Sequence, residues 1–299
     1  MTAAKIYRMT RRHVRPLHGN VTTLVAKGAI AWYCILAIGG FLVLNWIYQV
    51  IRKPVELLAP ISASFSKNPE STWQSYGSLF EKHSTSILSP EFLAALAQIE
   101  ASGNPVARTY WRWQWSWNPF EIYRPASSAL GMFQITDRTF VEARKYCIRD
   151  HEVVMDGPWY DPHSCWFNSL YTRTMPSHSI EMTAAYLHQS VVNTLAARRS
   201  APVSLAQKQK LAAVIHLCGF KRGESFLTRG FRVTPGELCG THSLRRYLSQ
   251  IDLMKRRFAR LREGGTEVSV AERRLSALSG SSSSPSPLAQ TSLQPFRKK

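Results

Sequence analysis

Residues 89–105 read SPEFLAALAQIEASGNP, a stretch that predicts one short helix with well-defined ends. Ser89 can cap the helix, Pro90 suits its first turn, and Glu91 lies near the positive end of the helix dipole. The GNP sequence at 103–105 predicts the end of the helix, because glycine and proline both interrupt helical backbone. We therefore expect a helix that begins after Ser89 and ends near residue 103.

Glu100 is predicted to lie on the apolar face of this helix, near its C-terminus. Leu93, Leu96 and Ala97 stand seven, four and three residues before it, which are helical spacings. Burial and the negative end of the dipole both disfavour a charged carboxylate there. A carboxylic acid that keeps its proton near neutral pH suits glycosidic bond cleavage, because the leaving oxygen must be protonated. The alternative is a Glu that emerges at the rim of the core beside a basic partner.

Two motifs stand in order along the chain, E-A-S-G-N-P at 100–105 and S-A-L-G-M-F-Q at 128–134. They resemble E-S-x-x-N-P and G-A-x-G-L-M-Q of the lytic transglycosylase family with a soluble-transglycosylase (goose-lysozyme-like) domain. Residues 185–187 are similar to that family's A-x-Y-L segment. The resemblance covers about residues 89–220. The matching positions are Glu100, Asn104, Pro105, Ala129, Gly131, Gln134, Ala185, Tyr186 and Leu187.

This resemblance implies an all-α, mainly helical, lysozyme-like domain that acts on peptidoglycan. Glu100 would be the sole general acid/base, and cleavage between N-acetylmuramic acid and N-acetylglucosamine would give a 1,6-anhydro product. No cofactor and no metal are implied. Gln134 would line the sugar cleft. The other residues that we assign to substrate binding are Ser102, Ser128, Gly131, Met132, Phe133, Tyr186, Trp111, Trp113 and His216.

The sequence departs from the family at several places. Ala101 replaces a serine that helps to orient the acid in relatives. The later Y-N-A-G motif is reduced to HLCG at 216–219, where His216 stands in place of the tyrosine. His216 is either a retained polar contact or a buried structural histidine. The stretch from Glu100 to Gln134 is also longer than is usual in the family.

The extra residues form a small tryptophan-rich insertion that includes YWRWQWSWNPF at 110–120. Tryptophans at 111, 113, 115 and 117 alternate with polar residues, and this period of two predicts a strand with all four on one face. An aromatic row beside a catalytic Glu suits carbohydrate, because the C–H faces of sugars stack on indole rings. The alternative is a hairpin whose tryptophans pack onto the domain as additional core.

Two alternative functions remain open. A hydrolytic, lysozyme-like muramidase would place a second carboxylate across the scissile bond, and Glu121 and Asp137 are the nearest candidates. Asp137 also suits the cap of a helix over residues 137–146. The departures from the family motifs also keep open a non-catalytic, membrane-tethered scaffold that binds peptidoglycan.

A membrane anchor is predicted near the N-terminus. Residues 28–51 contain no charged side chain and are long enough to span about 30 Å of hydrocarbon as a helix. Six basic side chains precede this run, whereas Arg52 and Lys53 follow it. The positive-inside rule then predicts a cytoplasmic N-terminus and a periplasmic catalytic domain, in a single-pass protein of a bacterial inner membrane. A cleaved signal peptide and a buried soluble helix are the alternatives.

The predicted organisation has five parts. A basic cytoplasmic tail (1–27) and a transmembrane helix (28–51) are followed by a periplasmic spacer (52–88), the catalytic domain (89–264) and a disordered Ser/Pro-rich tail (265–299).

Residues 242–263, HSLRRYLSQIDLMKRRFARLRE, predict a basic amphipathic helix. We expect this helix to dock on the catalytic domain with its cationic face in solvent; contact with anionic membrane or glycan peptide is the alternative. The apolar residues that recur near helical spacing are Leu244, Leu248, Ile251, Phe258 and Leu261.

The formal net charge of +19 points to an anionic partner, and the peptide carboxylates of peptidoglycan qualify. Nucleic acid is not expected, because no reading motif is present. By analogy, an envelope-spanning secretion or conjugation apparatus is a candidate partner for a tethered enzyme that opens the wall.

Four of the five cysteines lie beyond the apolar run, which contains Cys34. Their spacing fits no zinc-binding pattern. In an oxidising compartment we expect two disulfides, and we favour Cys147–Cys165 and Cys218–Cys239 because each closes a short loop. The alternative is four free, mostly buried thiols.

Overall fold

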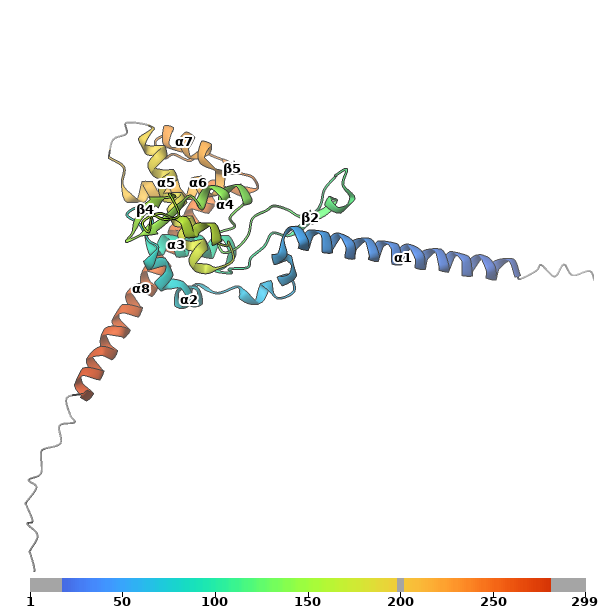
Figure 1. Ribbon diagram of the computed structural model, residues 1–299, viewed down its shortest axis with the longest axis horizontal. Helices are drawn as coiled ribbons and strands as arrows, with labels where there is room; N and C mark the ends of the chain where they lie inside the picture. Colours follow the sequence, from blue (N-terminus) through green and yellow to red (C-terminus); the bar gives the residue numbers. More distant parts are fainter. Residues whose placement is uncertain (1–17, 198–201, 281–299) are drawn as a thin grey trace, which may run out of the picture. The chain divides into compact units, whose positions relative to one another are not determined.

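The computed structural model describes residues 18–197 and 202–280 (Figure 1). These residues fall into two compact units. Unit 1 takes the chain up to Leu57 together with Tyr110–Ala126, and unit 2 takes Leu58–Thr109 and the chain from Ser127 on. Residues 1–17 of the predicted cytoplasmic tail lie outside the described residues, whereas residues 18–27 form the start of α1. The end of the predicted C-terminal tail, beyond Gly280, also lies outside the described residues.

Unit 1 combines one long helix with a small hairpin. Helix α1 spans His18–Arg52, and its segment Ala26–Arg52 is long and apolar enough to cross a membrane. A short 3-10 helix, η1 (Pro54–Leu58), follows it. The hairpin consists of β1 (Trp111–Trp113), η3 (Pro119–Glu121) and β2 (Tyr123–Pro125), with Trp113 paired to Tyr123 across the antiparallel strands.

Unit 2 is mainly helical, as the sequence predicts. Its longer helices are α2 (Pro69–Lys82), α3 (Pro90–Ala101), α4 (Asp137–Ala143), α5 (Pro176–Ala196), α6 (Leu205–Cys218), α7 (Phe220–Thr228) and α8 (Leu244–Gly280). Two-stranded antiparallel pairs are formed by β3 (Tyr146–Arg149) with β4 (Glu152–Met155) and by β5 (Leu238–Cys239) with β6 (His242–Ser243). The 3-10 helices are η2 (Ser62–Phe65) and η4 (Trp166–Leu170).

Helix α3 forms the centre of the unit 2 core. Its side chains from Phe92 to Ala97 are completely buried, and the helix packs against α2 and α8. Ser89 caps it by accepting a hydrogen bond from the Phe92 amide, and the chain leaves the helix at Ser102 in the left-handed conformation. The helix predicted from residues 89–105 is therefore confirmed at both ends.

Two predicted boundaries differ from the structure. The predicted spacer over residues 52–88 contains α2, whose Phe80 is completely buried in the core, followed by the buried Leu88. The sequence allows a short helix here but shows no sustained apolar periodicity, because the buried residues of α2 include Thr72 and Gly77 beside Tyr76 and Phe80. At the other end, α8 continues to Gly280, so the helix runs past the predicted start of the disordered tail at residue 265.

The basic amphipathic segment docks on the domain, as expected. The apolar side chains of α8 enter the same core as α3, and its Arg257 and Arg262 bind Glu70 and Glu91 at 2.7 Å. The four predicted residues that are buried are Leu244, Leu248, Ile251 and Phe258; Leu261 packs against them.

Two disulfides join Cys147 to Cys165 and Cys218 to Cys239, the pairs favoured from the sequence. The first fastens the β3–β4 hairpin to the loop before η4, and the second fastens the end of α6 to β5. Cys34 is free and exposed on α1. Such pairs fit an oxidising compartment.

We predict that Cys218→Ala/Cys239→Ala lowers the free energy of unfolding by about 3 kcal/mol, because the cross-link closes a loop of about 20 residues and restricts the unfolded chain. The measurement is denaturant unfolding of the full chain in detergent, followed by near-ultraviolet circular dichroism. Cys34→Ala is the control and should leave the midpoint unchanged. An unchanged midpoint in the double variant would contradict the prediction.

Candidate active site

Glu100 lies in the last turn of α3, at the end of the buried helix face. The turn that follows is fixed by backbone geometry: Ser102 and Gly103 have φ of 51° and 63°. A Cβ on Gly103 would lie 2.4 Å from Thr72 Oγ1, so only glycine fits against α2 at this point. The close contact holds the end of α3, and with it Glu100, at a defined place in unit 2.

Tyr247 of α8 is the direct partner of Glu100. Its hydroxyl donates to Glu100 Oε1 at 2.5 Å, and the residue is only 5% exposed. Burial raises the pKa of Tyr247 well above its usual range, and the negative charge and hydrogen bond of Glu100 raise it further. The phenol therefore stays protonated at neutral pH and remains a donor to the carboxylate.

His216 of α6 stands beside the same oxygen. Its Nε2 lies 3.6 Å from Glu100 Oε1, which is longer than a good hydrogen bond. The side chains of His216 and Glu100 are 13% and 15% exposed. Position 216 thus provides a polar side chain beside the carboxylate. The site consists of one shielded carboxyl with a phenol on one side and an imidazole nearby.

Tyr247 was missed by the sequence analysis. A signal was present, because Tyr247 lies three residues after Leu244 and four before Ile251 on the apolar face of the same helix. A tyrosine in a buried stripe needs a partner for its hydroxyl. Nothing local identifies that partner, since Glu100 lies 147 residues away in the chain.

The second motif forms a tight turn around Gly131 and Gln134. Gly131 has φ of 81°, and a Cβ there would lie 2.1 Å from the Arg173 carbonyl oxygen. Gln134 is also in the left-handed region, with φ of 48°, and its Nε2 donates to the carbonyls of Ala107 and Gly131. A non-glycine residue held in this conformation indicates a constraint that is typical of functional sites.

The remaining predicted substrate residues differ in how deeply they are buried. Met132 and Phe133 are completely buried in the core, so their side chains support the turn and do not reach a sugar. Ser128 accepts a hydrogen bond from the Asp137 amide, and Tyr186 is half-buried against the core. Among the described residues, the hydrogen bonds bring Tyr247 to Glu100 but do not link Gln134 to it.

Both candidates for a second carboxylate are engaged with arginines. Asp137 is 69% exposed and binds Arg173 at 2.7 Å. The cap of α4 is Thr136, which accepts from the Thr139 amide, and not Asp137 as predicted; Asp137 stands in the first turn instead. Glu121 belongs to unit 1, where it binds Arg52 at 2.7 Å and Arg124 at 3.2 Å. Asp137 and Glu121 are therefore each held in an ion pair with arginine.

The tryptophan row is only partly a strand. β1 ends at Trp113, and the chain bends at Trp117, so the prediction of one continuous strand with four aligned indoles is wrong. Trp111 and Trp113 both contact the Tyr123 ring, at centroid distances of 5.2 and 4.6 Å. All of these residues belong to unit 1, in which Trp115 and Trp117 are fully solvent-exposed.

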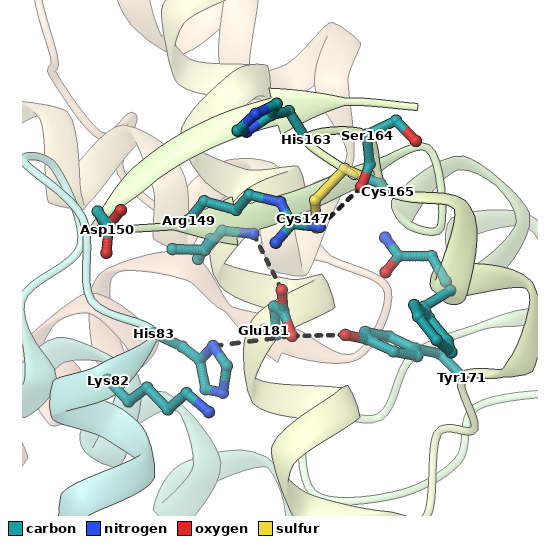
Figure 2. Close-up of a pocket in the computed structure, with 13 residues that line it drawn as sticks. Lys82, His83, Cys147, Arg149, Asp150, His163, Ser164, Cys165, Tyr171 and Glu181 are labelled. Carbon is teal, nitrogen blue, oxygen red and sulfur yellow. Dashed lines mark hydrogen bonds and ion pairs between the residues drawn. A yellow bond between two sulfur atoms is a disulfide. The ribbon is translucent and has the colours of Figure 1, made fainter. Parts of the chain in front are cut away.

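A separate pocket of about 670 Å³ lies beside the Cys147–Cys165 disulfide (Figure 2). Its centre is Glu181 of α5, which accepts from the Ile148 amide at 3.0 Å and from the Tyr171 hydroxyl at 2.8 Å. His83 Nδ1 approaches Glu181 at 3.8 Å. Both carboxylate oxygens are therefore occupied, and Glu181 ties α5 to β3 and to the end of α2.

This pocket is separate from the Glu100 site. None of its lining residues belongs to the Glu100 cluster. Of its two carboxylates, Glu181 already accepts hydrogen bonds at both oxygens, and Asp150 lies in the turn between β3 and β4. Within residues 18–197 and 202–280, no three His, Cys, Asp or Glu side chains gather closely enough to hold a metal ion.

Comparison of the chain with known protein families, with curated proteins and with solved structures gave no match.

Three histidines of unit 2 have pKa values below the usual range. Burial lowers the pKa of His83 more than the charge of Glu181 raises it, and burial also lowers the pKa of His178 and His188. A hydrogen bond from the Thr172 amide to His178 Nδ1, at 3.3 Å, further favours the neutral form of His178. Below pH 6.5 the unfolded chain therefore binds more protons than the folded one.

We predict that the free energy of unfolding falls as the pH is lowered from 7.5 to about 5.5, through the window between the unfolded and folded histidine pKa values. His83→Gln should weaken this dependence, because it removes one of the buried titrating groups. The check is the denaturant midpoint at both pH values, with the exposed His242→Gln as control. Equal pH dependence in wild type and His83→Gln would disprove the role of His83.

Proposed function

We propose that this chain is a membrane-anchored lytic transglycosylase that cuts the glycan strands of peptidoglycan, with Glu100 as its single general acid/base. The observation that carries the proposal is the shielded Glu100 carboxyl, which is 15% exposed and receives a hydrogen bond from a buried phenol. Support comes from the E-A-S-G-N-P and S-A-L-G-M-F-Q motifs that surround it in sequence. The implied fold of unit 2 is lysozyme-like.

In the first step, protonated Glu100 donates its proton to the oxygen between N-acetylmuramic acid and N-acetylglucosamine. We assign this transfer to Oε2, because Oε1 already accepts from Tyr247. The bond from C1 of the muramoyl residue to that oxygen breaks, and N-acetylglucosamine leaves as the alcohol. The 2-acetamido oxygen of the muramoyl residue can bond to C1, which removes the need for a second protein carboxylate.

In the second step, the Glu100 carboxylate takes the proton from the muramoyl C6 hydroxyl. The C6 oxygen then bonds to C1 as the acetamido oxygen leaves, which gives the 1,6-anhydro sugar. No water is consumed, and Glu100 returns to its protonated form, so that one residue serves as acid and then as base. The hydrogen bond from Tyr247 favours the carboxylate between the two steps.

The same proposal places α1 across a bacterial inner membrane, with unit 2 in the periplasm. The heavier basic flank before the apolar segment favours a cytoplasmic N-terminus. The two disulfides favour an oxidising compartment for unit 2. Peptidoglycan and the membrane are the partners implied, and an envelope-spanning secretion or conjugation apparatus is the candidate machine for which the wall would be opened.

We predict that the full-length chain in detergent releases anhydromuropeptides from purified sacculi and that Glu100→Gln abolishes this release, because glutamine cannot exchange a proton. Mass spectrometry distinguishes the products, since anhydro sugars are one water lighter than hydrolysis products. Glu91→Gln, on the same helix, is the matched control and should stay active. Reducing-end products would indicate a hydrolytic muramidase, and sacculus binding without any release would indicate a scaffold.

We predict that Tyr247→Phe lowers the rate of anhydromuropeptide release about ten- to a hundredfold, because it removes one hydrogen bond to a charged group. The pH profile of the rate should shift as well, since the carboxylate loses a donor. Tyr76→Phe removes another buried phenol from the same core and is the control. A rate and pH profile equal to those of the wild type would exclude Tyr247 as a positioning residue.

A further inference from the structure

Two polar side chains interrupt the apolar surface of α1 near its end. Asn45 is 1% exposed and Gln49 is 6% exposed, in contrast to the exposed apolar residues that surround them. Asn45 Nδ2 donates to the carbonyl of Tyr123, and Gln49 Nε2 donates to the carbonyl of Phe120, both at 2.7 Å. Amide N–H donors within an apolar segment are costly unless they are paired, and here carbonyls of the hairpin accept from both side chains.

Aromatic packing and an ion pair extend this contact along α1. The Phe120 ring stacks on Phe41 and Tyr48, with centroid distances of 6.2 and 5.4 Å. Arg52 binds Glu121 at 2.7 Å. The contacts recur on one helix face over roughly 16 Å, which is three turns at the end of the apolar segment. The hairpin is therefore held beside the end of the helix that would leave the membrane.

The hairpin presents exposed indoles next to this contact. Trp113 is 66% exposed, Trp115 is 94% exposed and Trp117 is fully exposed. Indole combines a large apolar ring with a polar N–H, and it prefers the boundary between lipid head groups and acyl chains. Trp113 is braced by Tyr123 at 4.6 Å, so the side chain is partly ordered before any ligand arrives.

The opposite side of the hairpin is cationic. Arg112 and Arg124 are direct cross-strand partners, an arrangement of like charges that is unfavourable in an isolated sheet. Glu121 offsets it in part, because Arg124 binds this carboxylate at 3.2 Å. Anionic lipid head groups at a membrane surface would attract such a cationic side.

We propose that residues 110–126 form a membrane-interface hairpin, which docks on the end of α1 and inserts Trp113, Trp115 and Trp117 at the head-group boundary of the same bilayer. The contacts with Asn45 and Gln49 fix its depth. This inference rests on α1 crossing the membrane, as proposed above, but not on the chemistry of Glu100. Stacking of the indoles on sugar is the competing idea, and the experiment below separates the two.

The test uses the full chain in vesicles of phosphatidylcholine and phosphatidylglycerol, with Cys34 replaced by alanine. An environment-sensitive fluorophore is attached at Trp115→Cys, and phosphatidylcholine brominated near the head group is the lipid quencher. Leu44→Cys, on the exposed face of α1, reports whether the helix is in the bilayer. Leu253→Cys, on the exposed side of α8, measures the response of a label in water to iodide.

The Trp115 label is expected to lose about half of its fluorescence to the brominated lipid, as interfacial aromatic positions do, and to resist iodide. Quenching at Leu44 but not at Trp115 would overturn the hairpin proposal and leave the anchor standing. Loss of lipid quenching at both positions would overturn the anchor and the hairpin together. A Trp115 label that is open to iodide, and is protected by added glycan strands, would overturn the proposal in favour of sugar binding.

A second pair of variants tests the docking contact. Asn45→Leu/Gln49→Leu removes both donors to the hairpin while making α1 more apolar, so the helix should stay inserted. Lipid quenching at Trp115 is expected to fall severalfold, because the hairpin loses its fixed depth. Val43→Leu/Ile47→Leu changes two exposed residues of the same helix and should have no effect. Undiminished quenching in the Asn45/Gln49 variant would contradict docking through these residues.

Discussion

The hydrogen bond from Tyr247 to Glu100 is the contact on which the candidate site depends. It joins the last turn of α3 to the buried face of α8, two helices that pack closely in the core of unit 2. A carboxyl at the edge of an apolar core needs such a donor, because an unpartnered charge there would be strongly unfavourable. The same contact holds the carboxyl in one orientation, so that core packing and the geometry of the site have a common origin.

The rule that buried polar groups must be paired also explains the other polar features of both units. Glu181 is saturated by an amide and a phenol and joins three elements around a disulfide. The side-chain N–H groups of Asn45 and Gln49 donate to carbonyls of the hairpin. Glu100 differs from these groups, because Tyr247 and His216 both approach Oε1. A carboxyl with one oxygen uncommitted is suited to proton transfer, whereas Glu181 is suited to holding the fold together.

The two units carry different parts of the proposed function. Unit 2 carries the candidate acid/base and contains two disulfides. Disulfides suit a domain in an oxidising compartment. Unit 1 carries the apolar helix and the aromatic hairpin. The hairpin sequence lies between the two motifs of unit 2, at 100–105 and 128–134. An insertion between the two motifs that folds with α1 ties the part of the chain that carries Glu100 to the apolar helix by chain connectivity alone.

The sequence by itself determined the local features: both ends of α3, the membrane-length apolar helix, the amphipathic face of α8 and the two short-loop disulfides. Each of these follows from spacing or from neighbours within about 20 residues. The partner of Glu100 and the docking of the hairpin on Asn45 were decided only by tertiary structure, across 147 and 78 residues. Periodicity shows that a side chain is buried, but the group it meets depends on how distant helices pack, which no local pattern encodes.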